Sequence, residues 1–233
     1  MKHAGQNVSG ARPCGDPLRL TRAVERRTLP DVAIPKGDKE GSFTYSDYLA
    51  WPDDERWELI HGVAYDMSPA PSRRHQGVLA YITHLFVTYL DGSPCSAYAA
   101  PFDVIFPESA DAAPDEIDTV VQPDLVVVCD SAKLTRQGCT GAPDFVLEIL
   151  SPTTAFKDME EKLRLYESHG VREYWILNPA NDTLMVYAVA PREHKPGYQK
   201  PVLFTSDDTV APQLFPGLSV GLGRVFDRDR EPS

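Results

Sequence analysis

The chain has 233 residues, enough for one large domain or two small ones. Hydrophobic residues make up 42% and charged residues 24%, which is typical of a globular protein and excludes a fibrous or wholly disordered chain. Lys and Arg number 23 and Asp and Glu 34, so the formal net charge is −11. That charge disfavours a protein that coats DNA non-specifically, but it permits an enzyme that meets nucleic acid through one basic groove or a metal ion.

No run of about 18 apolar residues occurs, so the sequence predicts no membrane-spanning helix. The first 20 residues also lack the apolar core of a secretory signal. The cysteines form no CxxC pair, which disfavours a cysteine zinc site; they are Cys14, Cys95, Cys129 and Cys139. Cys129 lies in the apolar run VVVC, where we expect a small buried side chain. We therefore predict a reduced, cytoplasmic protein without a membrane partner.

The N-terminal part differs from the rest of the chain. Residues 1–42 are polar, carry scattered Gly and Pro, and show no apolar periodicity. Residues 1–30 hold six Lys or Arg against two acids. We predict a flexible basic extension over 1–42, with a nucleic-acid-binding arm as the alternative. The folded domain is expected over 43–226 and a short tail over 227–233.

From residue 43 the chain alternates predicted helices and strands. Ser46–Leu49 is expected to form a short capped helix that ends before Pro52. The run 56–67 predicts two extended segments that turn at His61-Gly62. Apolar residues spaced by three and four predict an amphipathic helix over 72–90. Further strands are expected over 97–106, 119–129, 144–150, 172–177, 183–189 and 198–204, with an exposed acidic loop over 107–118 and a final β segment over 214–226.

A second helix is predicted over 155–169, closed by Gly170. At about 100° per residue its apolar stripe comprises Phe156, Met159, Leu163 and Tyr166, which we expect to pack on the sheet. Two long helices among many strands predict a single mixed α/β (α+β) domain.

Two acidic residues interrupt runs that are otherwise apolar. Asp124 opens the run LVVVC, and Glu148 lies inside FVLEIL. Such continuous apolar strands are covered on both faces, where an unpaired carboxylate costs several kcal/mol. The two strands are separated by a short loop and are expected to be neighbours, so the two charges would repel each other. A divalent cation would remove both costs, and oxygen ligands favour Mg²⁺ or Mn²⁺. The alternative is that each acid pairs with its own arginine.

Lys162 lies at the edge of the predicted apolar stripe. Its stem can follow apolar surface and bring the ammonium toward the sheet, where it would polarise a metal-bound water or hold a phosphate oxygen. The alternative is a solvated lysine paired with Asp158, four residues earlier.

Three further residues are candidates with weaker signals. Glu58 lies in the run WELI and is either another metal-site acid or an ion-pair partner of Arg56 or Arg164. His75 opens the first long helix, where it is either exposed and structural or acts with Arg73 and Arg74 on phosphate. Gln122 precedes Pro123-Asp124, and its amide is a candidate for orienting an acid or a water. No GxGxxG, P-loop, GxSxG or RNP motif occurs.

Seven segments occur in an order that resembles a known family. They are ELIHG (58–62), MSPAPSRRHQGV (67–78), QPDLVVVCD (122–130), GAPDFVLEILSPTT (141–154), DxxxK (158 and 162), LYESHGVREYWILNP (165–179) and FPGLSV (215–220). Together they resemble the Uma-type family of restriction endonucleases, which belongs to the PD-(D/E)XK nuclease superfamily. The resemblance covers about 43–226.

The resemblance implies a restriction-endonuclease-like core, with a central mixed β-sheet flanked by helices, and a site for Mg²⁺ or Mn²⁺. It implies that Asp124 and Glu148 bind metal, and that Glu58 matches a further metal-site acid. The superfamily lysine normally stands two residues after the second acid, where this chain has Leu150. The family is similar in this respect, and the resemblance assigns the lysine to Lys162. His75 falls in a family segment without an assigned role.

The function expected on these grounds is metal-dependent hydrolysis of DNA phosphodiester bonds by an endonuclease. Its catalytic residues would be Glu58, Asp124, Glu148 and Lys162, with His75 and Gln122 as auxiliary candidates. The alternatives are a non-catalytic nucleic-acid- or protein-binding module on a nuclease fold, and an oligomeric scaffold whose buried acids are ion-pair partners. We expect a homodimer, because nucleases that cut both strands often use two sites.

Overall fold

The computed structural model describes residues 42–52, 54–67, 71–151, 157–190 and 197–227, which all belong to one compact unit. The expected extension and tail therefore lie outside the described residues, except for Ser42 and Asp227. No helix within the described ranges is long and apolar enough to cross a membrane.

The first sheet is small and begins with the predicted helix and hairpin. Helix α1 (Tyr45–Tyr48) precedes strands β1 (Trp57–Ile60) and β2 (Val63–Asp66). His61 and Gly62 turn the chain with positive φ angles of 49° and 76°. Strands β5 (Val120–Val121), β4 (Asp103–Ile105) and β7 (Gly138–Thr140) complete the sheet in the order β2-β1-β5-β4-β7.

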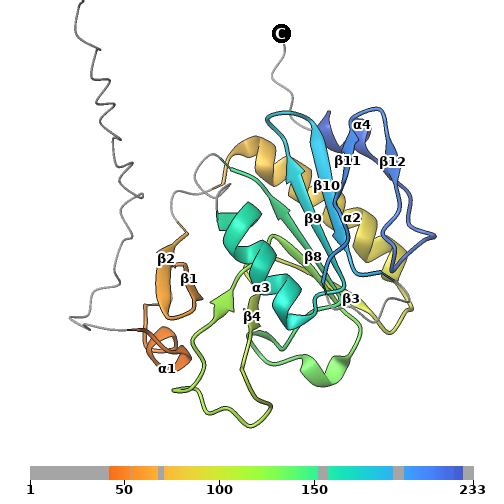
Figure 1. Ribbon diagram of the computed structural model, residues 1–233. Helices are drawn as coiled ribbons and strands as arrows, with labels where there is room; N and C mark the ends of the chain where they lie inside the picture. The colour runs from red at the N-terminus through yellow and green to blue at the C-terminus, as the bar shows by residue number, and fades with distance from the viewer. Residues whose placement is uncertain (1–41, 53, 68–70, 152–156, 191–196, 228–233) are drawn as a thin grey trace, which may run out of the picture. The chain divides into compact units, whose positions relative to one another are not determined.

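The second sheet forms the centre of the molecule, and helices cover both of its faces (Figure 1). Its order is β11-β10-β9-β8-β6-β3, with bounds β11 (Val202–Thr205), β10 (Thr183–Ala188), β9 (Glu173–Asn178), β8 (Phe145–Ile149), β6 (Leu125–Val128) and β3 (Ser96–Ala99). Only β8 and β9 run parallel among these pairs. The mixed sheet flanked by helices agrees with the expected fold class.

Alternate residues of the central strands enter two different cores. Leu125 and Val127 pack with α2 (Arg73–Leu90), while Val126 and Val128 pack with α3 (Lys162–His169). This two-sided burial explains why β6 reads as a continuous apolar run in the sequence. An acid on either face of these strands is therefore enclosed by a helix.

Two predicted strands are each divided between the sheets. The run 97–106 becomes β3 and β4, and the run 119–129 becomes β5 and β6. Pro101 and Pro123 lie at the two breaks. Since proline has no N–H to donate to a ladder, it favours the place where a chain leaves one sheet for another.

The predicted C-terminal β segment is also only partly correct. The region contains β12 (Thr209–Val210) and β13 (Val220–Gly221), which pair with each other, followed by helix α4 (Leu222–Phe226). Leu222, Val225 and Phe226 are buried, and this spacing of three and four is helical. A short 3₁₀ helix, η1 (Ser131–Lys133), lies between β6 and β7 in the chain.

The predicted apolar stripe of the second helix is only partly correct, since Tyr166 is buried but the other described members are not. Met159 is 37% exposed and Leu163 only half-buried, whereas Lys162 is 1% exposed. Phe156 lies outside the described residues. The cause is a π-helical segment, η2 (Lys157–Glu161), directly before α3. Its wider turns change the angular spacing between residues, so a stripe drawn at 100° per residue does not continue through it.

The expectation of wholly reduced cysteines is wrong as well. Cys95 and Cys129 form a disulfide, and Cys129 is only half-buried. The pairing of Ser96 with Val128 brings the two cysteines opposite each other at the ends of β3 and β6. Their separation of 34 residues along the chain gave no sign of this contact. Cys139 is free and buried.

Candidate active site

The register of β6 and β8 brings the two predicted metal-site acids together. Leu125 pairs with Leu147 and Val126 with Val146, so one further step places Asp124 opposite Glu148. Alternation puts both acids on the same face as Val126, which is the face covered by α3. The expectation that the two acids lie on neighbouring strands is confirmed.

Asp124 is held by three different parts of the chain. Its Oδ2 accepts a hydrogen bond of 2.7 Å from the backbone N of Ile149 and lies 3.1 Å from His75 Nε2. The backbone N of Asp124 lies 3.4 Å from Glu148 Oε2. Within the part of the chain that the structure describes, neither acid pairs with an arginine, so the arginine alternative is wrong there.

Lys162 lies at the centre of the site. Its Nζ is 2.7 Å from both Glu148 Oε1 and Glu58 Oε1, and 3.6 Å from Asp158 Oδ1. Tyr166 OH also donates to Glu148 Oε1, at 2.9 Å. The predicted pairing with Asp158 is therefore present, but the lysine is buried rather than solvated. Lys162 lies on the buried face of α3 together with Leu165 and Tyr166, three and four residues later.

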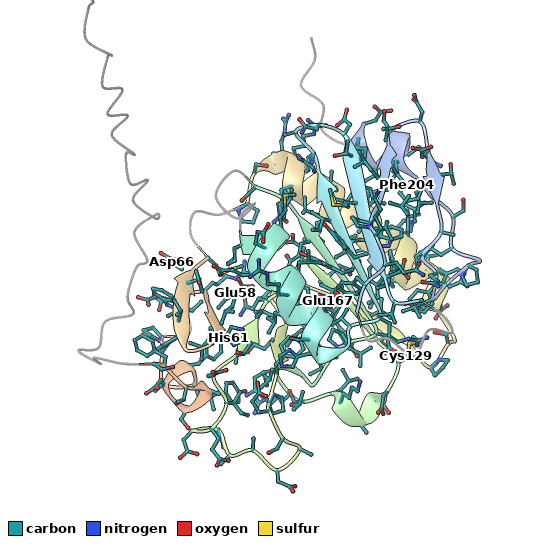
Figure 2. The ribbon with its side chains drawn as sticks, in the orientation of Figure 1. Glu58, His61, Asp66, Cys129, Glu167 and Phe204 are labelled. Carbon is teal, nitrogen blue, oxygen red and sulfur yellow. A yellow bond between two sulfur atoms is a disulfide. The ribbon has the colours of Figure 1, made fainter. Side chains whose placement is uncertain are left out.

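Glu58 is completely buried and reaches the same cluster from β1, opposite α3 (Figure 2). Its Oε2 accepts from Lys157 Nζ, and its Oε1 accepts from the backbone N of Gln122 at 2.9 Å as well as from Lys162. The two arginines predicted as partners of Glu58 bind other residues: Arg56 binds Gln122, and Arg164 binds Glu160. Lys157 was missed because residues five apart do not share a face of a regular α-helix.

Burial and neighbouring charges shift the pKa values of these groups in opposite directions. Burial raises the pKa of Glu58, but Lys162 and Lys157 outweigh it, so that the net pKa is lowered. Burial also raises the pKa of Glu148, and there the single Lys162 does not compensate for burial and the charges of Asp158, Asp124 and Glu58. Burial lowers the pKa of Lys162, but its three acidic neighbours raise it well above its usual value. The three acids therefore favour the charged form of Lys162, which donates hydrogen bonds.

His75 is buried in the first turn of α2. Its backbone N donates to the N-cap Ser72 Oγ at 3.2 Å, and its ring lies against Asp124. Burial lowers the pKa of His75, but the contact with Asp124 outweighs this and raises it. The exposed alternative is thus wrong. The proposed phosphate-binding trio does not act as a unit, because Arg74 pairs with Asp182 at 2.5 Å.

Gln122 links the site to a second polar network. Its Nε2 donates to Asp103 Oδ1 at 2.8 Å and to Tyr48 OH at 3.1 Å, and its Oε1 accepts from Arg56. The amide orients no acid of the lysine cluster; only the backbone N of Gln122 reaches Glu58. Asp103 and Tyr48 carry no motif in the sequence, and only the folding of β4 and α1 against β5 places them here.

The donor chemistry at Asp124 and Glu148 fits a divalent metal ion. Mg²⁺ and Mn²⁺ prefer oxygen ligands, and the two acids supply neighbouring carboxylates. Among the described residues, Asp124 Oδ1 has no hydrogen-bond donor, and Glu148 Oε2 has only the long contact with the Asp124 backbone. The described cluster also holds more acids than lysines, even though His75 lies against one of the acids: Glu58, Asp124, Glu148 and Asp158 against Lys157 and Lys162. A bound cation would offset this excess.

The predicted three-acid ligand set is not assembled. Across residues 42–52, 54–67, 71–151, 157–190 and 197–227, no group of three or more His, Cys, Asp or Glu side chains is arranged to hold a metal ion. Both oxygens of Glu58 face the ammonium groups of Lys157 and Lys162. Glu58 therefore binds lysines in this structure, and the ligands available to a metal are Asp124 and Glu148.

The fold is restriction-endonuclease-like. A crystal structure of "a putative nuclease belonging to DUF820" from Anabaena variabilis ATCC 29413 has a TM-score of 0.62 to this chain. The match covers 79% of this chain and 97% of the Anabaena chain, at 20% sequence identity, and it establishes the fold alone.

The family follows from the sequence match. Residues 45–223 match the Uma2 family, whose description reads "Putative restriction endonuclease", and the chain belongs to that family. This confirms the resemblance found in the seven segments. An uncharacterized protein of Synechocystis sp. (strain ATCC 27184 / PCC 6803 / Kazusa), slr1290, is 25% identical over 150 residues, which are 64% of this chain and 71% of the relative.

Proposed function

We propose that this protein is a Mg²⁺- or Mn²⁺-dependent endonuclease that hydrolyses phosphodiester bonds of DNA. The observation that supports it most is the pair Asp124 and Glu148, opposed on neighbouring strands, with Lys162 buried against the second acid. The family description and the printed name of the Anabaena structure point to the same class of reaction. DNA, rather than RNA, is our choice because restriction endonucleases act on it.

Each residue of the cluster has a distinct proposed role. Asp124 and Glu148 would hold the metal, which when bound polarises the scissile phosphate and lowers the pKa of water. Lys162 donates to Glu148 Oε1 and so leaves Oε2 directed toward Asp124. Glu148 and Lys162 would together position and activate the attacking water. Glu58 would contribute by holding Lys162 and Lys157, rather than as the third metal ligand that the sequence predicted.

His75 and Gln122 would act as positioning residues. His75 fixes one oxygen of Asp124 and leaves the other available. Gln122 fixes Glu58 through its backbone N–H. We further propose that the protein works in the cytoplasm, where a DNA substrate lies, and that it acts as a homodimer that cuts both strands.

Cleavage of a panel of plasmid and linear DNA substrates in Mg²⁺ or Mn²⁺ tests the activity. The wild type should nick or cut DNA, whereas Asp124→Asn, Glu148→Gln and Lys162→Met should lose activity by about 100-fold or more. Arg224→Gln, on α4 and exposed, is the matched control and should cleave normally. Equal cleavage by the site variants would identify a contaminating nuclease and contradict the proposal.

Metal binding can be measured without knowing the substrate. Calorimetric titration of Mn²⁺ into the wild type should show saturable binding that Asp124→Asn abolishes. Identical titrations for the two proteins would contradict the assignment of Asp124 as a ligand.

The net charge of −11 favours one other candidate, a binding module on a nuclease fold without catalysis. Such a protein would shift DNA or RNA in gels with a steep salt dependence and would cleave neither under any metal. Metal-dependent turnover by the wild type excludes it.

A further inference from the structure

A second cation lies beside the lysine cluster and differs from it in its partners. Arg56 precedes β1, and its Nε and Nη2 donate to Gln122 Oε1 at 3.1 and 2.9 Å. The Gln122 amide is itself held by Asp103 Oδ1 and Tyr48 OH, and Tyr48 OH also donates to Asp103 at 2.9 Å. Gln122 and Asp103 are buried, while Arg56 is half-buried. The network therefore holds the guanidinium in one orientation at the edge of the interior.

The hydrogen-bond partner of Arg56 is a neutral amide, whereas five other described cations pair with acids. Lys157 and Lys162 pair with acids, and so do Arg74, Arg164 and Arg172. Arg56 has no carboxylate within ion-pair distance among the described residues, and its Nη1 has no partner there. An amide oxygen orients a guanidinium without cancelling its charge. Gln122 lies between Arg56 and Asp103, so the attraction between their charges acts across the amide and not through a direct ion pair.

Strand register places Arg56 next to the candidate active site. Arg56 lies two residues before Glu58, and its neighbour across the hairpin is Met67, whose backbone N donates to Arg56 O at 3.0 Å. Met67 and Glu58 both contact Lys157 Nζ, so the two residues that flank Arg56 in the hairpin lie against the lysine cluster. Gln122, which holds Arg56, lies two residues before Asp124 on the chain.

We propose that Arg56 is a substrate-binding residue that contacts a backbone phosphate of the nucleic acid beside the reacting one, and that Gln122 positions it. The inference rests on the proposed function, because it assigns a contact to the same substrate. The fork of a guanidinium matches two phosphate oxygens. In a chain of net charge −11, an arginine that has no direct ion pair among the described residues also offsets the repulsion of the incoming phosphate.

Fluorescence anisotropy with a short fluorescein-labelled DNA duplex in Ca²⁺ tests the proposal. Arg56→Gln should weaken binding by about tenfold or more and reduce the slope of log affinity against log salt by about 1. Arg56→Lys should recover part of the affinity, although lysine lacks the fork that donates twice to Gln122. If Arg56 only stabilised the fold, Arg56→Lys would not regain DNA affinity over Arg56→Gln. Calorimetric Mn²⁺ binding without DNA should be unchanged in both variants.

Arg224→Gln is the matched control, since it removes the same charge from α4 and should keep normal affinity. If wild-type protein binds the duplex and Arg56→Gln binds equally well, or if Arg224→Gln loses as much affinity, the inference is wrong while the proposed function stands. If the wild type neither binds nor cleaves DNA, both are wrong. Thermal unfolding checks the fold of each variant, and Arg56→Met replaces Arg56→Gln in the binding assay if the latter does not fold.

Discussion

Glu58 and Glu148 reach the same ammonium group from two different sheets, and yet their surroundings differ. Each places Oε1 2.7 Å from Lys162 Nζ, and both are buried. Glu58 has a second lysine and a backbone N–H as partners. Among the described residues Glu148 has no second lysine, and the charges of Asp158, Asp124 and Glu58 act on it. The pKa of Glu58 is therefore lowered and that of Glu148 is raised.

The two glutamates differ in whether both carboxylate oxygens have close partners within the described protein. Burying a carboxylate is costly unless cations and hydrogen bonds satisfy it, and at Glu58 both oxygens are satisfied by the protein itself. At Glu148 one oxygen is satisfied, and the other has only the 3.4 Å contact with the backbone N of Asp124 among the described residues. We therefore expect Glu58 to contribute to the stability of the fold, and Glu148 to supply an oxygen to the proposed cation.

The largest expected effect is the loss of Glu58. Glu58→Gln removes the counter-charge shared by Lys157 and Lys162, and it should lower the free energy of unfolding by about 3–5 kcal/mol. Glu148→Gln should cost about 1 kcal/mol or less in EDTA, because the amide still accepts from Lys162 and Tyr166 and the fold does not favour the charge. Urea unfolding of the three proteins measures both values. An equal or larger loss for Glu148→Gln would contradict the comparison.

Metal should stabilise only the Glu148 end. At a free Mn²⁺ concentration of about 100 times the dissociation constant, the wild type should gain about 2.7 kcal/mol in unfolding free energy. Asp124→Asn should gain nothing, and Arg224→Gln should gain as much as the wild type. Thermal unfolding with and without Mn²⁺ measures the gain. A gain retained by Asp124→Asn would place the bound ion elsewhere.

The two acids should also make opposite contributions to the pH dependence of stability in metal-free protein. The lowered pKa of Glu58 means that its stabilisation is present above the usual value of about 4.5 and is lost as the pH falls below it. The raised pKa of Glu148 means that the folded state binds its proton more tightly, so its contribution falls as the pH rises above about 4.5. Unfolding midpoints across pH, with Glu58→Gln and Glu148→Gln as references, isolate each slope. Slopes of the same sign would refute the assignment.

The smallest effect is expected at an exposed pair on the same helix. Arg164 and Glu160 lie 3.1 Å apart at i,i+4 spacing, and the arginine side chain is 80% exposed. Arg164→Ala should change the unfolding free energy by no more than about 0.5 kcal/mol, since water screens this pair. A loss comparable to that of Glu58→Gln in the same urea assay would show that burial does not cause the difference.

Local sequence patterns predicted much of the candidate site. The apolar runs around Asp124 and Glu148 indicated buried neighbouring strands, and the register confirms it. The helix 72–90 and the hairpin at His61-Gly62 followed from spacing and turn chemistry alone. These predictions succeeded because burial on both faces and a two-residue turn each require a recognisable pattern of a few consecutive residues.

The partners of those acids did not follow from sequence. Lys157 reaches Glu58 only because a π-helical segment changes the angular spacing before α3. Arg56 meets Gln122, and Cys95 meets Cys129, through strand pairings that join distant segments. Spacing rules assume regular geometry and describe only nearby residues, so they carry no information about these contacts.

The sequence by itself therefore determined the family, the mixed α/β class and the two acids, Asp124 and Glu148, that interrupt apolar strands and need a counter-charge. Only the tertiary structure decided which cations lie beside the acids of the site. Two lysines contact Glu58, one contacts Glu148, and an arginine held by an amide lies nearby. The physical reason is that the cost of burying a charge is set locally, by apolar neighbours along the strand. The compensation depends on side chains that only the packing of α3 and the two sheets brings within a few ångströms.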